Sequence, residues 1–195
     1  MKYTRESIIK RYNAGEPLNI IAFWGHTPHP KKMTKACFSQ WYDCSFELLG
    51  ERYHTSEQYM MAQKAALFGD METKARIMAA DHPKDYKALG REVKNFDAAL
   101  WDREKYSIVL RGNLAKFSQN PELGAFLLST GNSVLVEGSP YDHIWGVRLG
   151  IDDPRIQNPN EWLGQNLLGF VLMETRDELR TGFSSSSHIA GPAEE

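Results

Sequence analysis

Two short segments carry the residues best suited to chemistry, a charged helical stretch in the first half of the chain and an acidic, aromatic loop in the second. The first begins at Thr55 and holds Glu57 and Lys64, which lie two helical turns apart on one face. The second holds Asp142 and Trp145. Two carboxylates, an ammonium group and an indole suit acid–base or charge-stabilising chemistry on a flat ring.

Each of these residues also has a structural explanation. Glu57 falls in the first turn of a predicted helix, where the helix dipole favours a carboxylate, and for Glu57 taken alone this is the better explanation. Lys64 also fits a solvated helix face. Asp142 and Trp145 also fit an aspartate turn beside a core tryptophan. The sequence alone leaves these alternatives open.

Three further polar residues in the second half could serve a site. Glu137 closes a predicted strand, where it would line a site or cap a neighbouring turn. Arg176 in the last predicted helix would hold a phosphate or form a buried ion pair. Asn166 lies near the start of that helix, where free amide groups can receive an anion.

Metal and nucleophile chemistry find less support. The histidines lack the i, i+4 pairing of a helical zinc site, and His26 and His29 lie in a proline-rich segment. Cys37 and Cys44 are too few for a disulfide framework and are expected to be reduced, small apolar residues. No glycine-rich phosphate loop or nucleophile-elbow serine is present. We therefore expect neither a metal nor another cofactor.

Composition limits the class of protein. With 195 residues, 42% of them hydrophobic and 25% charged, the chain suits one globular domain with a sizeable core. A net charge of -2 gives no overall basic field for nucleic acid, so a nucleic-acid substrate would need a pocket. The polar N-terminus and the lack of a long apolar run predict a cytoplasmic protein without a membrane span.

Helical periodicity outweighs strand alternation, which predicts an α+β fold that is predominantly α-helical with a few short strands. Helices are predicted over residues 4–13, 56–68, 72–80, 83–89, 98–118, 121–129 and 163–179, and strands over 18–24, 45–49, 51–54 and 134–137. Thr55 and Gln58 fit a capping box, which fixes the phase of the second helix. We expect a single domain over residues 1–181 and a disordered tail over 182–195.

The chain resembles the NADAR family, also called YbiA-like N-glycosidases, over most of its length. The resemblance rests on short motifs that follow one another in family order: Cys37 to Trp41, Tyr53 to Ala65, Gly90 and Arg91 with Trp101, Lys116 with Phe117, Leu128 to Gly131, Leu135 to Glu137, Asp142 to Gly146, and Gly164 to Gly169 with Leu172, Met173 and Arg176. The family's Ser-Asn-Phe reads Ser39-Gln-Trp41 here, and its Gly-Lys-Asn reads Gly164-Gln-Asn166.

This resemblance implies hydrolysis of the bond between a nucleobase-like ring and ribose C1, through an oxocarbenium-like transition state. Family members act on early riboflavin-pathway ribosylaminopyrimidines or remove ADP-ribose from guanine bases. We expect the second activity, on an ADP-ribose-containing substrate attached to DNA or RNA bases. The riboflavin intermediates are the alternative substrate, and a non-catalytic module that binds ADP-ribose or NAD is the alternative of another class.

The resemblance also implies roles for individual residues. Glu57 or Asp142 would stabilise the ribosyl cation or activate water. Lys64 would donate a proton or balance charge at the ribose, or its amine would attack the sugar to form a Schiff base. The expected substrate-binding residues are Phe23, Ser39, Trp41, Tyr59, Glu137, Trp145, Gly146, Asn166 and Arg176.

Overall fold

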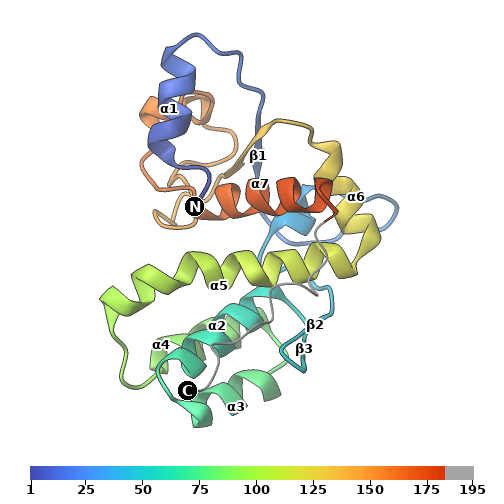
Figure 1. The fold of residues 1–195 in the computed structure, drawn as a ribbon, viewed down its shortest axis with the longest axis vertical. Helices are drawn as coiled ribbons and strands as arrows, with labels where there is room; N and C mark the ends of the chain where they lie inside the picture. Colours follow the sequence, from blue (N-terminus) through green and yellow to red (C-terminus); the bar gives the residue numbers. More distant parts are fainter. Residues whose placement is uncertain (183–195) are drawn as a thin grey trace. The chain divides into compact units, whose positions relative to one another are not determined.

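The computed structural model describes residues 1–182, and the chain in it divides into two compact units (Figure 1). Among the described residues, unit 1 comprises residues 1–39 and 122–177, and unit 2 comprises residues 40–121 and 178–182. Unit 2 is therefore built mainly from one continuous segment. Unit 1 is assembled from two segments that lie far apart in the sequence.

Unit 1 is organised around two parallel strands, β1 (Ile20–Phe23) and β4 (Val134–Glu137), paired from Ile20↔Val134 to Phe23↔Glu137. Val134, Leu135 and Val136 are fully buried, as expected of a strand covered on both faces. The other elements are α1 (Arg5–Asn13), η1 (Lys35–Phe38), α6 (Pro121–Ser129), η2 (Pro154–Gln157), η3 (Pro159–Glu161) and α7 (Leu167–Arg180).

Unit 2 is organised around helix α2 (Ser56–Leu67), which packs against α3 (Met71–Ala79), α4 (Pro83–Glu92) and α5 (Ala98–Gln119) (Figure 1). Gly112 of α5 permits a close approach to α2, because a Cβ atom there would lie 2.5 Å from Cδ1 of Tyr59. An antiparallel hairpin, β2 (Phe46–Leu48) with β3 (Glu51–Tyr53), precedes α2. Leu49 and Gly50 both have positive φ angles (56° and 75°), as a tight two-residue hairpin turn requires.

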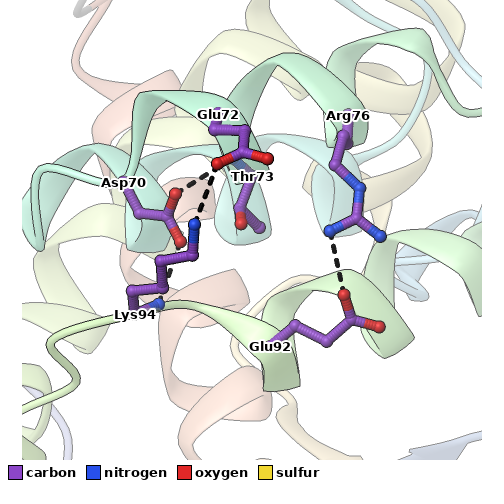
Figure 2. Close-up of polar contacts among 6 residues, drawn as sticks. All are labelled: Asp70, Glu72, Thr73, Arg76, Glu92 and Lys94. Atoms are coloured by element: carbon purple, nitrogen blue, oxygen red, sulfur yellow. Dashed lines mark hydrogen bonds and ion pairs between the residues drawn. The ribbon is translucent and has the colours of Figure 1, made fainter.

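A polar network joins the start of α3 to the end of α4 (Figure 2). Asp70 accepts hydrogen bonds from the backbone N–H groups of Lys94, at 2.9 Å, and Thr73, at 3.1 Å. These bonds lower the pKa of Asp70 to about 2. The ion pairs Lys94–Glu72 and Arg76–Glu92 are exposed and add little individually. Asp70 is therefore the residue that fixes the chain just beyond α4.

The predicted fold class is confirmed, since most elements are helical and the strands are few and short. The predicted helices and strands all occur, with ends that shift by a few residues. Within residues 1–182 no helix has the length and apolar character needed to cross a membrane. The single domain stays a prediction, and the predicted tail lies outside the described residues apart from Gly182.

Two local predictions need correction. The last helix begins at Leu167 and not at 163, because the backbone N–H groups of Leu163 and Gln165 bond to the carbonyls of Val147 and His143. The capping box at α2 is incomplete. Thr55 accepts a hydrogen bond from the Gln58 backbone, but the Gln58 side chain accepts one from the backbone of His54 instead of Thr55.

The first turn of α7 lies directly against β4, and Gly169 makes this approach possible. A Cβ atom on Gly169 would overlap the backbone carbonyl oxygen of Leu135. Backbone atoms cannot rotate away as a flexible side chain can, so this contact requires glycine.

Gly169→Ala should therefore lower the free energy of unfolding by about 1–3 kcal/mol, the usual range for overpacking. Thermal unfolding followed by circular dichroism measures the effect. Gly150→Ala is the matched control, because a Cβ atom on Gly150 would meet nothing within 4 Å. Equal melting temperatures for the two variants would contradict the proposed close contact.

Candidate functional site

The candidate residues of unit 1 gather where β1 and β4 end. The two strands run parallel and stop at the same level, with Phe23 opposite Glu137. Beyond this edge, the Gly138 N–H bonds the Phe23 carbonyl at 2.9 Å, and the Val147 N–H bonds the Glu137 carbonyl at 3.0 Å. The loop from 138 to 147 therefore starts and returns at the carboxyl edge of the strands, a common position for ligand sites.

Asp142 shapes this loop. Its Oδ1 accepts hydrogen bonds from the backbone N–H groups of Ile144, at 2.9 Å, and Trp145, at 2.8 Å. This is the aspartate turn that the sequence offered as the structural explanation. Among the described residues, nothing donates a hydrogen bond to Oδ2 of the half-buried Asp142. The turn therefore engages one oxygen of the carboxylate and leaves the other for a ligand or water.

Asn166 holds the end of β4 in place. Its Oδ1 accepts a hydrogen bond from the Glu137 N–H at 3.0 Å, and its Nδ2 donates one to the Leu135 carbonyl at 2.9 Å. The side chain is fully buried, and its backbone adopts a left-handed φ of 58°. The predicted role of Asn166 was to receive an anion at the helix start. In the structure, both ends of its side-chain amide bond to the backbone of β4, and the anion-binding role stays a prediction.

Gly146 brings the loop close to the strand end. A Cβ atom on this residue would lie 2.9 Å from the Glu137 carbonyl oxygen and 3.1 Å from that of Asp142. Its own carbonyl accepts a hydrogen bond from the Asn166 N–H at 3.1 Å. Gly146 and Asn166 thus position the half-buried side chains of Glu137 and Trp145.

Arg176 is an internal anchor of unit 1. Its side chain is 1% exposed, and Nη1 donates hydrogen bonds to the Thr130 hydroxyl, at 2.8 Å, and the Ser133 carbonyl, at 2.9 Å. Both partners belong to the turn between α6 and β4. These bonds hold that turn in place, and a phosphate-binding role for Arg176 stays a prediction.

The aromatic residues that were predicted to stack on a substrate divide into two groups. Phe23 and Tyr59 are buried, Phe23 edge-on to Phe38 in unit 1 and Tyr59 edge-on to Tyr53 in unit 2. Phe23 is therefore part of the hydrophobic core of unit 1, and Tyr59 is part of that of unit 2. Trp145 in unit 1 and Trp41 in unit 2 are half-buried, as is the predicted binding residue Ser39 at the end of η1. The two tryptophans are the better candidates for stacking.

In unit 2, Glu57 lies in the first turn of α2 and is only 4% exposed. Its backbone N–H donates to the Gln40 carbonyl at 2.9 Å, and the Gln40 side chain accepts a hydrogen bond from Asn113 of α5 at 3.0 Å. The start of α2 is therefore held firmly against α5. A carboxylate in the first turn also stabilises the helix through its interaction with the helix dipole.

Lys64 lies in the last turn of α2 and reaches the end of α4. Its Nζ donates a hydrogen bond to the Gly90 carbonyl at 2.7 Å and lies 4.4 Å and 5.7 Å from the ring centroids of Phe96 and Trp101. A cation is favoured at a helix C-terminus and over aromatic faces. Burial nevertheless lowers the pKa of Lys64, and within residues 1–182 it forms no ion pair.

Sequence reasoning gave no role to three residues, although two of them, Trp101 and Lys116, belong to the family motifs. Phe96 and Trp101 form the aromatic surface at Lys64. Lys116 of α5 is fully buried, with its Nζ 5.7 Å from the Tyr42 ring centroid and 5.1 Å from that of Phe117. Its spacing of four residues from Gly112 places it on the buried helix face, which is the signal that could have identified it.

The comparisons with known proteins agree on one family. The family model described as the NADAR domain matches residues 22–180. An N-glycosidase of Acanthamoeba polyphaga mimivirus is 49% identical over 146 residues, which cover 72% of this chain and 86% of the relative. N-glycosidase YbiA of Escherichia coli is 32% identical over 130 residues, which cover 67% and 72% of the two chains.

The solved structure of the E. coli protein YbiA, determined by NMR, resembles this chain with a TM-score of 0.67. The two are 28% identical in sequence, and the match covers 84% of this chain and 86% of that one. The likeness therefore extends over most of both chains.

Lys64 should lose its proton below the ordinary value of 10.5, because burial penalises the charged amine. In an NMR titration of lysine ε-carbons, we expect the Lys64 signal to move before that of Lys94, whose pKa is raised by its bond to Glu72. Lys64→Arg identifies the signal by its loss. A Lys64 signal that moves with or after Lys94 would contradict the effect of burial.

The same shift has a consequence for stability. Between the lowered folded pKa of Lys64 and its unfolded value, the folded protein binds fewer protons than the unfolded chain. The free energy of unfolding of the wild type, relative to Lys64→Met, should therefore rise with pH in the window below 10.5.

Proposed function

The chain belongs to the NADAR family and is an N-glycosidase, a hydrolase that cleaves N-glycosyl bonds, and on that premise we propose that it removes ADP-ribose from guanine bases. Hydrolysis would break the bond between ribose C1 and the base nitrogen. The base leaves with the bonding electrons and gains a proton, while water or an enzyme group adds to C1. The reaction needs negative charge near C1 and a source of protons for the base.

Glu57 is the observation on which the proposal rests. A carboxylate that is 4% exposed and held in the first turn of a rigid helix is suited to stabilise a ribosyl cation. A preorganised charge in such surroundings needs no reorganisation when the transition state forms. We propose that Glu57 stabilises the cation or accepts the proton of the attacking water, with Asp142 as the alternative carboxylate for this role.

Lys64 has two chemical roles open to it, and its surroundings favour one of them. Since burial lowers the pKa of Lys64 and no carboxylate pairs with it among residues 1–182, a larger fraction of its side chain is neutral amine than for an exposed lysine. A neutral amine can attack C1, expel the base and, after the ribose ring opens, form an imine that water hydrolyses. We propose this nucleophilic role in preference to proton donation.

The substrate is tested with two compounds supplied separately, DNA that carries ADP-ribosylated guanosine and a ribosylaminopyrimidine phosphate. Chromatography should detect free ADP-ribose and restored guanine from the first. Cleavage of the second alone would select the riboflavin alternative. Binding of ADP-ribose without release of product from either compound would favour the non-catalytic module and contradict the proposal.

Glu57→Gln should reduce the cleavage rate on the order of a hundredfold or more, because the carboxylate charge is lost while the side-chain volume is kept. Glu92→Gln, which alters an exposed carboxylate of α4, is the matched control and should retain activity. Asp142→Asn removes the carboxylate charge but keeps the turn, since an amide oxygen can still accept the hydrogen bonds of Ile144 and Trp145. Full activity of Asp142→Asn would restrict Asp142 to its structural role.

A further inference from the structure

The segment that follows β1 is an exposed basic loop, which we define as residues 24–35 of unit 1. It opens with Trp24, whose side chain is 55% exposed, and contains Lys31, Lys32 and Lys35. Every residue from 24 to 32 is exposed. No aspartate or glutamate occurs from residue 17 to residue 42, although the chain as a whole carries a net charge of -2. The positive charge of the basic loop is therefore not balanced by acidic residues of its own segment.

The two ends of the basic loop are tied together. The Lys35 ammonium donates a hydrogen bond to the carbonyl of Ala22 in β1 at 2.6 Å. Within the loop, the Lys31 N–H donates to Nδ1 of His29 at 3.1 Å, and Pro28 and Pro30 restrict the backbone. The loop thus has less conformational freedom to lose on binding a partner than an unrestrained segment of equal length.

The basic loop leaves from the same edge as the candidate residues of unit 1. Phe23, the residue before Trp24, is paired with Glu137 in the parallel strands, and its carbonyl accepts the hydrogen bond from Gly138. The loop that contains Asp142 and Trp145 begins at this point. The exposed indole of Trp24 therefore follows directly after the strand end that is paired with Glu137, and the Lys35 ammonium returns to β1 at the Ala22 carbonyl.

We propose that the basic loop binds single-stranded nucleic acid, with Lys31 and Lys32 at backbone phosphates and Trp24 stacked on a base. An exposed aromatic beside lysines is the combination by which proteins hold single strands without reading their sequence. This inference rests on the proposed function and deepens it, because it makes the substrate a guanine within a strand and not a free nucleoside.

The pyrophosphate of ADP-ribose offers the same phosphate chemistry as a polynucleotide. We favour the strand, because Lys31 and Lys32 are solvent-exposed and the exposed indole of Trp24 gives a neighbouring base a stacking surface. A compact pyrophosphate would need convergent donors instead. Binding measurements with unmodified oligonucleotide and with free ADP-ribose distinguish the two sources.

The test is fluorescence anisotropy of the full chain with an unmodified, labelled single strand of about 12 nucleotides, within the site size of single-strand binders. Lys31→Ala/Lys32→Ala should weaken binding and reduce the slope of log affinity against log salt by about 1.4, since each phosphate contact contributes about 0.7. Trp24→Ala should weaken binding about fivefold or more, the equivalent of one lost stacking contact. DNA and RNA versions of the strand should bind alike.

Lys10→Ala/Lys84→Ala is the charge-matched control, because it removes two exposed lysines outside the basic loop. This variant should keep the wild-type salt slope, and circular dichroism should show all variants folded. Equal affinity and equal slope for wild type and Lys31→Ala/Lys32→Ala would overturn the proposal. So would a loss of affinity for free ADP-ribose that equals the loss for the strand, since the loop would then hold the pyrophosphate.

The binding test is independent of cleavage. A protein that binds the strand through the basic loop but cleaves neither substrate contradicts the proposed function alone. A protein that cleaves modified guanine without loop-dependent binding contradicts this inference alone. Where both hold, Lys31→Ala/Lys32→Ala should raise KM for a modified oligonucleotide and leave cleavage of the modified mononucleoside unchanged.

Discussion

The architecture of unit 1 depends on the amide side chain of Asn166. Its Nδ2 donates to the carbonyl of Leu135 and its Oδ1 accepts from the N–H of Glu137, the two groups that flank Val136 on one edge of β4. The backbone N–H and C=O of one residue in a third parallel strand would make the same pair of bonds. One side chain thus replaces a strand, satisfies buried backbone groups and ends the sheet at two strands.

The bonds of the Asn166 side chain to β4 also fix the surroundings of Glu137. Because α7 begins directly after Asn166, the helix lies against the strand at a distance that only glycine at 169 permits. The backbone of residues 163–168 then pairs with that of residues 143–147, so the loop bearing Asp142 and Trp145 is held along its length. A short, irregular sheet therefore supports side chains with the precision usually given by longer elements.

The sequence predicted the elements whose signals are local. The periodicity of α2 and its Thr55 cap sufficed for that helix, and β4 was evident as an apolar run. The start of α7 was misplaced because Leu163 and Gln165 find their backbone partners some twenty residues away, and no local pattern encodes such pairing.

The burial and contacts of side chains were harder to predict than the positions of helices and strands. Residue type does not separate Tyr59, which packs in the core, from Trp41, which stays half-exposed. Residue type likewise does not reveal that the Lys64 ammonium lies against the carbonyl of Gly90 and beside two aromatic rings. Net charge likewise concealed the basic loop, because acidic residues elsewhere cancel its lysines.

The pairing of β1 with β4 has a consequence for the order in which the chain folds during synthesis. The partner of Ile20 is Val134, so the first strand leaves the ribosome long before the second exists. The segment from 40 to 121 intervenes and carries most of the contacts of unit 2 within itself. Unit 2 can therefore fold before β4, the pairing partner of β1, has been synthesised. The pairing of β1 with β4 is then a late and slow step of folding.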